Sequence, residues 1–246
     1  MSPARRRALF AALAGANPQP RSDLEYSSTF ELLVAVVLSA QATDRSVNQA
    51  TAGLFARART PAEIVSLGVE GLEAYIRTIG LFRSKARNVL ALCRQLLELH
   101  GGEVPRSREA LEALPGVGRK TANVVLNIAF GEPSIAVDTH VFRLANRTGL
   151  APGRTVRAVE DGLLAAVPRQ YRQHAHHWLI LHGRYVCKAR TPQCWQCIIA
   201  RQCEYATKTP DPATAAAGSP ARKRVGPVAR AVRARTPARA KSSGRV

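Results

Sequence analysis

Residues that break helices divide this chain into short segments, and their spacing constrains the fold more than any other feature. Between the breaks, apolar residues recur with the period of a helix, and no run alternates apolar and polar residues as a half-buried strand does. We therefore predict an all-α protein of about ten short helices. The breaks fall at Pro61, Gly80, Gly101-Gly102, Pro105, Pro115, Gly131, Pro133 and Pro152-Gly153.

The clearest helical pattern is an apolar stripe between Val89 and Leu97. Cys93 lies within this stripe, which makes it a small core residue rather than a metal ligand or nucleophile. Four further segments should form helices, the first of them densely apolar and therefore buried: residues 30–38, 43–56, 156–167 and 171–186.

The N-terminal segment permits two interpretations. Arg5-Arg6-Arg7 ahead of residues 8–16 resembles a signal peptide, but the apolar part is short and mostly alanine. We favour an opening helix, because the cysteines described below favour a reducing compartment. No apolar run reaches the ~18 residues that crossing a bilayer takes.

The chain is strongly basic, with 36 Lys and Arg against 17 Asp and Glu and a formal net charge of +19. Residues 207–246 hold ten basic residues and one acidic residue, Asp211, so their net is +9 and the other +10 belongs to the body. Such a charge does not select a fold, but it favours polyanionic partners. Nucleic acid is the first candidate, and an anionic membrane surface is the second.

From about Thr207 the composition changes to Ala, Pro, Arg, Lys, Gly and Ser. Such a segment cannot bury enough apolar surface to offset the entropy of ordering it. We predict that residues 207–246 are a disordered basic tail. Its role is either to solubilise the protein or to attract phosphates without sequence preference.

Residues 108–127 have the pattern of two helices joined by the turn Leu114-Pro115-Gly116-Val117-Gly118. The two glycines allow positive φ and a tight reversal, and they leave backbone N–H groups uncovered at the start of the second helix. Those donors and the positive end of the helix dipole suit a phosphate oxygen. Val117 should point inward and fix the turn to the core. An ordinary helical hairpin is the alternative, but we favour a DNA-binding helix–hairpin–helix.

Lys120 falls in the first turn of that second helix, where the helix dipole disfavours a cation. The same repulsion, with partial burial, would stabilise the neutral amine that a nucleophile needs. A lysine that only contacts phosphate is the alternative.

Asp138 stands between an apolar run and a helical pattern, within Ala136-Val137-Asp138-Thr139-His140. It should cap the following helix. The same position would fix a carboxylate at the mouth of a cleft, able to accept a proton or to stabilise positive charge at a sugar carbon. His140 is left without a role, and the histidines of residues 174–182 are expected to pack or to contact phosphate rather than to bind metal.

Four of the five cysteines crowd into 17 residues with intervals of six, two and five residues: Cys187, Cys194, Cys197 and Cys203. This clustering indicates a metal site. A [4Fe–4S] cluster suits the wide loops best, zinc is the second choice because only one short pair occurs, and disulfides are the third. Basic residues on the loops suggest that the cluster presents positive charge to DNA rather than acting as a redox catalyst.

These motifs follow one another in a fixed order: the hairpin with its lysine, then Ala-Val-Asp-Thr-His, then the cysteine loop. In that order, and in the segments 38–44, 114–127, 136–140 and 176–184, the chain closely resembles the endonuclease III branch of the helix–hairpin–helix DNA glycosylase family. The resemblance spans roughly residues 25–205.

The resemblance implies two all-α domains that flank a cleft. A six-helix domain, residues 22–132, carries the hairpin. A helical domain of residues 1–21 and 133–206 carries a [4Fe–4S] cluster on the four clustered cysteines.

The resemblance also implies a bifunctional reaction on double-stranded DNA with oxidised pyrimidines or abasic sites. The enzyme flips the damaged nucleotide, Lys120 attacks the sugar, Asp138 assists, and β-elimination through a Schiff base cuts the strand. Gln41 and Leu81 match the residues that fill the gap in the base stack, and Ile79 is a neighbouring candidate. The alternatives are core packing for Ile79 and Leu81 and a helix cap for Gln41.

We expect such a protein to act as a monomer in the cytoplasm, at the nucleoid. Two other functions remain open. An adenine glycosylase would lack Lys120 and carry a further folded C-terminal domain, and a non-catalytic DNA-binding module would use the hairpin and the metal loop for recognition alone.

Overall fold

The computed structural model describes residues 1–217, so most of the predicted tail, residues 218–246, lies outside the described residues. Within residues 1–217 the chain forms eleven α-helices, two short 3-10 helices and no strand, which confirms the all-α prediction. The helices are α1 (Pro3–Ala16), α2 (Thr29–Leu38), α3 (Asp44–Arg57), α4 (Pro61–Ile76), α5 (Phe82–His100), α6 (Arg108–Glu112), α7 (Arg119–Phe130), α8 (Thr139–Thr148), α9 (Val156–Ala166), α10 (Arg172–Tyr185) and α11 (Pro212–Ala217).

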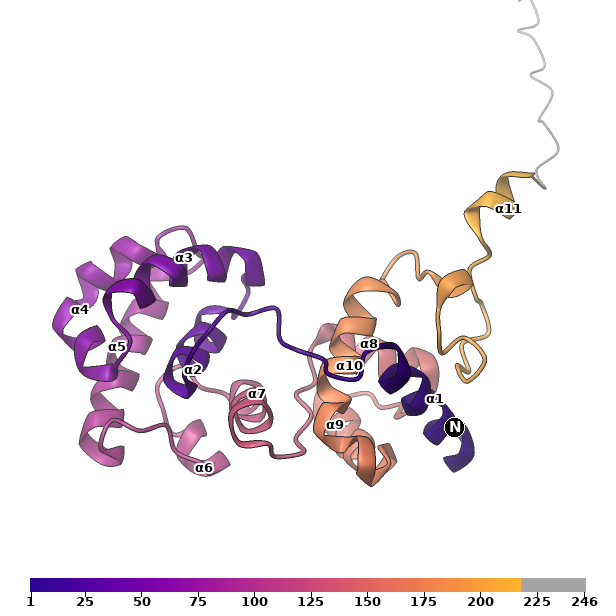
Figure 1. Ribbon diagram of the computed structural model, residues 1–246, viewed down its shortest axis with the longest axis horizontal. Coiled ribbons are helices and arrows are strands. Elements are labelled where there is room, and N and C mark those ends of the chain that lie inside the picture. Colours follow the sequence, from indigo (N-terminus) through magenta and orange to yellow (C-terminus); the bar gives the residue numbers. More distant parts are fainter. Residues whose placement is uncertain (218–246) are drawn as a thin grey trace, which may run out of the picture. The chain divides into compact units, whose positions relative to one another are not determined.

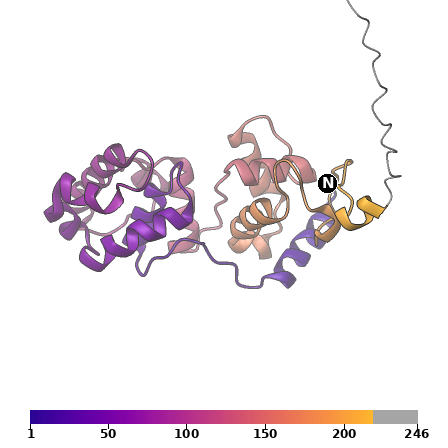
Figure 2. The ribbon, with the colours of Figure 1, turned by 90° about the horizontal axis from the view of Figure 1, so that it is seen from above.

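The helices pack around two hydrophobic clusters (Figure 1). Helices α2–α7 surround the first cluster, and we call them the first lobe. Helices α1 and α8–α10, with the cysteine loop of residues 187–203, surround the second cluster and form the second lobe. The chain passes between the lobes twice, after α1 and after α7, and these two connections are visible in Figures 1 and 2.

The first lobe is built around α2, whose residues are apolar on all faces apart from Thr29 and Glu31. Every residue from Phe30 to Leu38 is buried, and the Ser28 side chain accepts a hydrogen bond from the Glu31 N–H to cap the helix. Because both faces of α2 are apolar, the other helices can pack around it. The predicted stripe of α5 is buried from Val89 to Leu96, whereas Leu97 is 40% exposed.

In the second lobe, α1 packs against α10. Leu9, Phe10 and Leu13 are buried, and Phe10 stacks on Tyr171 with ring centroids 5.9 Å apart. The indole N–H of Trp178 donates to the Asn17 carbonyl at 2.8 Å, just beyond the end of α1. The N-terminal segment therefore forms the expected opening helix, and its apolar residues belong to the core of this lobe.

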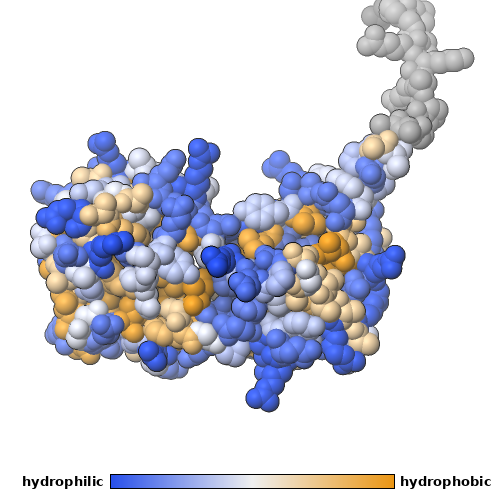
Figure 3. All heavy atoms as spheres, viewed as in Figure 1, coloured by the Kyte–Doolittle hydropathy of each residue, from blue (hydrophilic) through white to orange (hydrophobic). Residues whose placement is uncertain are grey.

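Residues 1–211 form one compact unit, and α11 belongs to a second one. Figure 3 shows one face of the molecule, on which hydrophilic side chains dominate both lobes and apolar ones form only patches. No helix within residues 1–217 has the length and apolar character needed to cross a membrane.

Candidate active site

The predicted hairpin is formed by α6, the turn and α7. Leu114 and Val117 are 2% and 6% exposed, so the turn is fixed to the first core as expected. Helix α7 begins after Gly118, which has no side chain to cap it. The first N–H groups of α7 therefore remain available to an anion from outside.

The two glycines of the turn act differently. Gly116 has φ +80°, and a Cβ there would lie 3.1 Å from Cβ of Asn88, so both backbone and space require glycine. Gly118 has φ −98°, contrary to the expectation that both glycines use positive φ. Nothing lies within 4 Å of the place where its Cβ would be. Gly118 therefore leaves an open approach to the start of α7 rather than permitting the turn.

Lys120 is the second residue of α7 and is exposed rather than partly buried. It lines a cavity of ≈ 70 Å³ whose other walls come from both lobes and from the connection between α1 and α2. Ser39 and Asp44 belong to the first lobe, and His176 and Arg184 to α10 of the second. Polar and charged groups therefore surround the amine on several sides.

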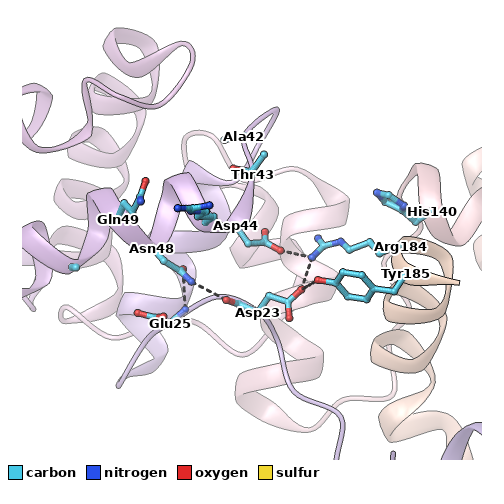
Figure 4. Close-up of a pocket in the computed structure, with 12 residues that line it drawn as sticks. Asp23, Glu25, Ala42, Thr43, Asp44, Asn48, Gln49, His140, Arg184 and Tyr185 are labelled. Carbon is cyan, nitrogen blue, oxygen red and sulfur yellow. Dashed lines mark hydrogen bonds and ion pairs between the residues drawn. The ribbon is translucent and has the colours of Figure 1, made fainter. Parts of the chain in front are cut away.

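A larger cavity of ≈ 800 Å³ lies beside the first and shares Asp23, Asp44 and Arg184 with it. Figure 4 shows Arg184 reaching from α10 to Asp44, at the start of α3, and to Asp23, with an Nη1–Oδ2 distance of 2.8 Å for Asp23. The Tyr185 hydroxyl donates to the same Asp23 oxygen at 2.9 Å. His140 lines this cavity too. These contacts tie the second lobe to the first across the site.

His176 stands beside Lys120 in the smaller cavity and is 3% exposed. Burial is the main cause that lowers the pKa of His176 to about 3, and electrostatic repulsion from His177 and Lys120 contributes, although a hydrogen bond to the Ala136 backbone opposes them. Its Nδ1 has no hydrogen-bond partner. His176 is therefore a neutral imidazole at the site. Three α10 histidines, His176, His177 and His182, are buried, consistent with the packing role expected of them.

Asp138 caps α8, as predicted. Its Oδ1 accepts hydrogen bonds from the N–H groups of His140 and Val141 at 2.9 and 2.8 Å. The cap holds the carboxylate half-buried at the start of a second-lobe helix, whereas Lys120 starts a first-lobe helix. Asp138 does not line the cavity that contains Lys120, but His140, two residues later, lines the neighbouring one.

Gln41 and Leu81 share an unusual backbone conformation. They have φ of 55° and 61°, and no other non-glycine residue among those described has positive φ. Both are exposed, Leu81 by 61%. A Cβ on Gly80 would lie 4.0 Å from the Gln41 carbonyl oxygen, so the two turns lie side by side. Left-handed backbone at non-glycine residues concentrates at functional sites, because a side chain there carries a steric cost.

Ile79 is placed differently from these two. It is 2% exposed and belongs to the first core cluster. Ile79 therefore matches the packing alternative, and Leu81 is the exposed side chain of this turn.

The four clustered cysteines line one cavity at the end of α10, and none forms a disulfide. Arg147 donates to the Cys187 sulfur at 3.5 Å, and His182 Nε2 lies 3.3 Å from the Cys197 sulfur. Burial raises the pKa of the Cys197 thiol to about 11, because a thiolate loses its hydration there. Within residues 1–217, no three His, Cys, Asp or Glu side chains are gathered closely enough to form a ready metal-binding group.

Sequence reasoning missed several residues of this site, notably Asp23, Asp44, His176 and Arg184. Residues 38–44 and 176–184 are recognisable as family segments, but nothing in them shows that Arg184 meets Asp44 from 140 residues away. The charges of Asp44 and Arg184 were the feature of the sequence that could have predicted an ion pair. A charged residue inside an apolar helical segment needs a partner when the helix is buried.

Comparison with known proteins agrees with the geometry. Residues 34–169 match the family model of HhH-GPD superfamily base excision DNA repair proteins. Endonuclease III of Escherichia coli (strain K12) is 60% identical over 208 residues, which are 85% of this chain and 99% of that protein. Endonuclease III of Treponema pallidum (strain Nichols) is 57% identical over 196 residues, or 80% of this chain and 93% of that one.

Solved structures give the same result. A trapped endonuclease III–DNA covalent intermediate aligns with a TM-score of 0.78 and 45% identity, over 83% of this chain and 97% of that one. A thermostable thymine-DNA glycosylase, 23% identical with a TM-score of 0.73, shares the fold. The hairpin, the match over more than half of the chain and the identity with curated relatives lead to one conclusion: the chain belongs to the endonuclease III family, within the HhH-GPD superfamily of base excision DNA repair proteins.

Proposed function

We propose that this chain is a bifunctional DNA glycosylase and abasic-site lyase of base-excision repair that acts on oxidised pyrimidines through Lys120. The observation that carries this proposal is the position of the lysine. Lys120 stands in the uncapped first turn of the hairpin helix and lines a cavity to which both lobes contribute. A sugar carbon brought to that cavity by a phosphate held on the same helix would meet the amine directly.

Duplex DNA would be held by the hairpin. The open N–H groups after Gly118 suit a phosphate oxygen, and Gly116 and Val117 keep the turn that presents them. The net charge of +19 supplies attraction that does not depend on sequence. We place the enzyme on the DNA of the nucleoid, as a monomer.

The two exposed left-handed residues would fill the space that a flipped nucleotide leaves. Leu81 would act as an apolar wedge, and Gln41, in the neighbouring turn, would face the base left without a partner. The fold of the protein itself holds their backbone in the strained conformation. The enzyme would therefore not need to distort these turns when it binds, which favours the flipped state.

The chemistry then has two stages. The neutral Lys120 amine attacks C1′ of the sugar, the bond from C1′ to the base nitrogen breaks, and the base leaves with the electron pair and takes a proton. The sugar ring opens to give a Schiff base between Nζ and C1′. Loss of a proton from C2′ and departure of the 3′ phosphate oxygen cut the strand, and water releases the lysine.

Asp138 would assist both stages from the start of α8. Its Oδ1 is held by two backbone N–H groups, so the carboxylate is fixed in orientation. A fixed carboxylate can stabilise positive charge that develops at the sugar carbon and can relay a proton. Movement of the lobes or entry of the nucleotide would bring C1′ between Asp138 and Lys120.

We infer that Cys187, Cys194, Cys197 and Cys203 hold a [4Fe–4S] cluster. All four thiols surround one cavity without forming a disulfide, and thiolates are the donors that such a cluster takes. When bound, the cluster would cross-link the loop after α10 and present its basic residues to DNA. We also divide the chain at the predicted bounds, residues 22–132 against 1–21 with 133–206, because the two core clusters follow that division.

Borohydride trapping tests this function. The wild-type protein should form a covalent adduct with a duplex that contains an oxidised pyrimidine and with a duplex that contains an abasic site. Peptide mapping should find both adducts on Lys120. A duplex with adenine opposite 8-oxoguanine should give none. Tight binding of damaged DNA without any adduct or base release would favour a non-catalytic binding module, and release of adenine without an adduct would favour an adenine glycosylase.

A further inference from the structure

Glu160 is a buried carboxylate of the second lobe that reaches the hairpin of the first. It lies on α9 and is 3% exposed. Burying a carboxylate without partners is costly, so its position calls for an explanation. The explanation is in its hydrogen bonds and ion pairs, which within residues 1–217 go to residues of α6 and α7.

Side chains from both helices of the hairpin, α6 and α7, contact this carboxylate. The Arg119 Nη2 and Nε donate to Glu160 Oε1 and Oε2 at 2.7 and 3.0 Å, a two-pronged pair. The Asn123 amide donates to Oε1 at 3.2 Å. From α6, Arg108 Nη1 lies 3.9 Å from Oε1 and donates to the Asn123 side chain. One carboxylate of the second lobe therefore holds α6 and α7 of the first.

This arrangement determines what Arg119 does. It is the first residue of α7, beside the open N–H groups expected to hold phosphate, and a basic side chain there would ordinarily be a phosphate ligand. Glu160 instead holds the guanidinium, and hydrogen bonding to Glu160 is the main cause that raises the pKa of Arg119. Arg119 is therefore paired within the protein before any DNA arrives.

The next residue along the chain is Lys120. Glu160 in turn belongs to the lobe of Asp138, because α8 and α9 share the second core through residues such as Leu144, Val159 and Leu163. We propose, building on the proposed function, that Glu160 is a positioning residue that fixes the first turn of α7, which holds Lys120, relative to the lobe of Asp138. In this proposal Arg119 pairs with Glu160 and does not bind a DNA phosphate.

Glu160→Gln tests the proposal, since it removes the charge and keeps the shape. The single-turnover rate of strand cleavage on an abasic duplex should fall about 10- to 100-fold, because small displacements of a nucleophile are that costly. Binding of the same duplex is compared without borohydride, in a Lys120→Gln background with and without Glu160→Gln. The two dissociation constants should differ by less than about twofold. The matched control is Asp161→Asn, the next residue on α9, which is exposed and pairs with Arg157 of its own helix.

Arg119→Gln gives a second, independent test, with the Tm measured beside the rate because this variant leaves the buried Glu160 carboxylate without its main partner. It should slow cleavage as much as Glu160→Gln does, and the double variant should be no slower than either. The slope of binding against salt should stay at the wild-type value, whereas a lost phosphate contact would reduce it by about one.

Wild-type cleavage rates in Glu160→Gln would overturn the proposal, as would a parallel loss of binding and rate. A reduced salt slope in Arg119→Gln would overturn the assignment of Arg119. Each of these results is distinct from failure of the proposed function, because in that case the wild-type protein itself would form no adduct.

Discussion

The two lobes hold the residues proposed for function in different ways. In the first lobe, Gln41, Leu81 and Lys120 lie exposed at turns and at the start of a helix, above an apolar core. In the second lobe, Asp138 and His176 are half-buried or buried and carry hydrogen bonds to the backbone. Substitutions of these residues in the first lobe should therefore change stability little. In the second lobe the same polar contacts hold these residues and the fold, so only a substitution that keeps those contacts should spare stability.

The largest effect in the second lobe should come from Asp138→Asn, which separates chemistry from folding there. Removal of an oxidised pyrimidine should slow about 10²- to 10³-fold, because the carboxylate that assists base departure is lost. Cleavage of a ready-made abasic site should slow less. The Tm should hardly change, since Asn caps helices as well as Asp does. Gel assays on the two duplexes and calorimetry measure these, and removal of the oxidised pyrimidine at the wild-type rate would contradict the role given to Asp138.

Leu72→Ala should damage the first lobe without touching its site. Leu72 is fully buried in the first core, and its truncation should reduce the free energy of unfolding by about 3 kcal/mol. Leu99→Ala is the matched control, because Leu99 is 61% exposed and its loss should change stability by less than about 0.5 kcal/mol. Urea unfolding measures both free energies of unfolding. Similar losses for the two variants would show that burial in the apolar core does not stabilise this lobe.

Cys197→Ser should damage the second lobe alone. Loss of one ligand should remove the visible absorption of an iron–sulfur cluster and lower the free energy of unfolding by about 2 kcal/mol, or the Tm by about 4–8 °C. Hydrogen exchange should quicken in residues 187–209 and stay unchanged in α2–α5. Cys93→Ser provides the comparison, since Cys93 lies in the first core and should leave the absorption intact. A colourless wild-type protein would contradict the cluster.

His176 should make the stability of the second lobe depend on pH. Its pKa is lowered to about 3 in the folded protein, so it stays neutral there and takes up a proton in the unfolded chain below its ordinary value of about 6.5. Its contribution is complete above pH 6.5 and falls as the pH drops toward 3, by up to about 1.4 kcal/mol per pH unit. Across this pH range the free energy of unfolding should fall less steeply for His176→Gln than for the wild-type protein. An unchanged dependence on pH would contradict the assignment to His176.

The smallest effect on stability should be a gain. Leu81→Gly removes a side chain from a left-handed position and should stabilise the protein by about 0.5–1 kcal/mol. It should also weaken binding to a duplex with a lesion, because the wedge is gone. Leu81→Ala, which keeps the backbone strain, should lose the binding without the gain. A stabilised Leu81→Gly that binds the lesion normally would remove Leu81 from the recognition of damage.

Local sequence patterns predicted much of the fold, because helix periodicity and caps are properties of neighbouring residues. The buried α2, the Asp138 cap and the inward Val117 all follow from such patterns. Gly118 did not follow, since a glycine can be selected for open space as well as for positive φ.

What escaped prediction depends on contacts between distant segments. The Arg184 pairs with Asp23 and Asp44 and the Glu160 pairs with Arg119 and Arg108 join residues far apart in the chain, and only the packing of the two lobes brings them together. Ile79 is a similar case. It is buried in the first core, whereas Leu81, two residues later, has left-handed backbone and is 61% exposed.

The central claim is that the Lys120 amine performs the reaction, and Lys120→Gln tests it most directly. Because Lys120 is exposed, this variant should fold normally and keep its Tm. We predict that its single-turnover cleavage of an abasic duplex falls by ~10³-fold or more and that borohydride traps no adduct. A folded Lys120→Gln that cuts the duplex at the wild-type rate would contradict the account.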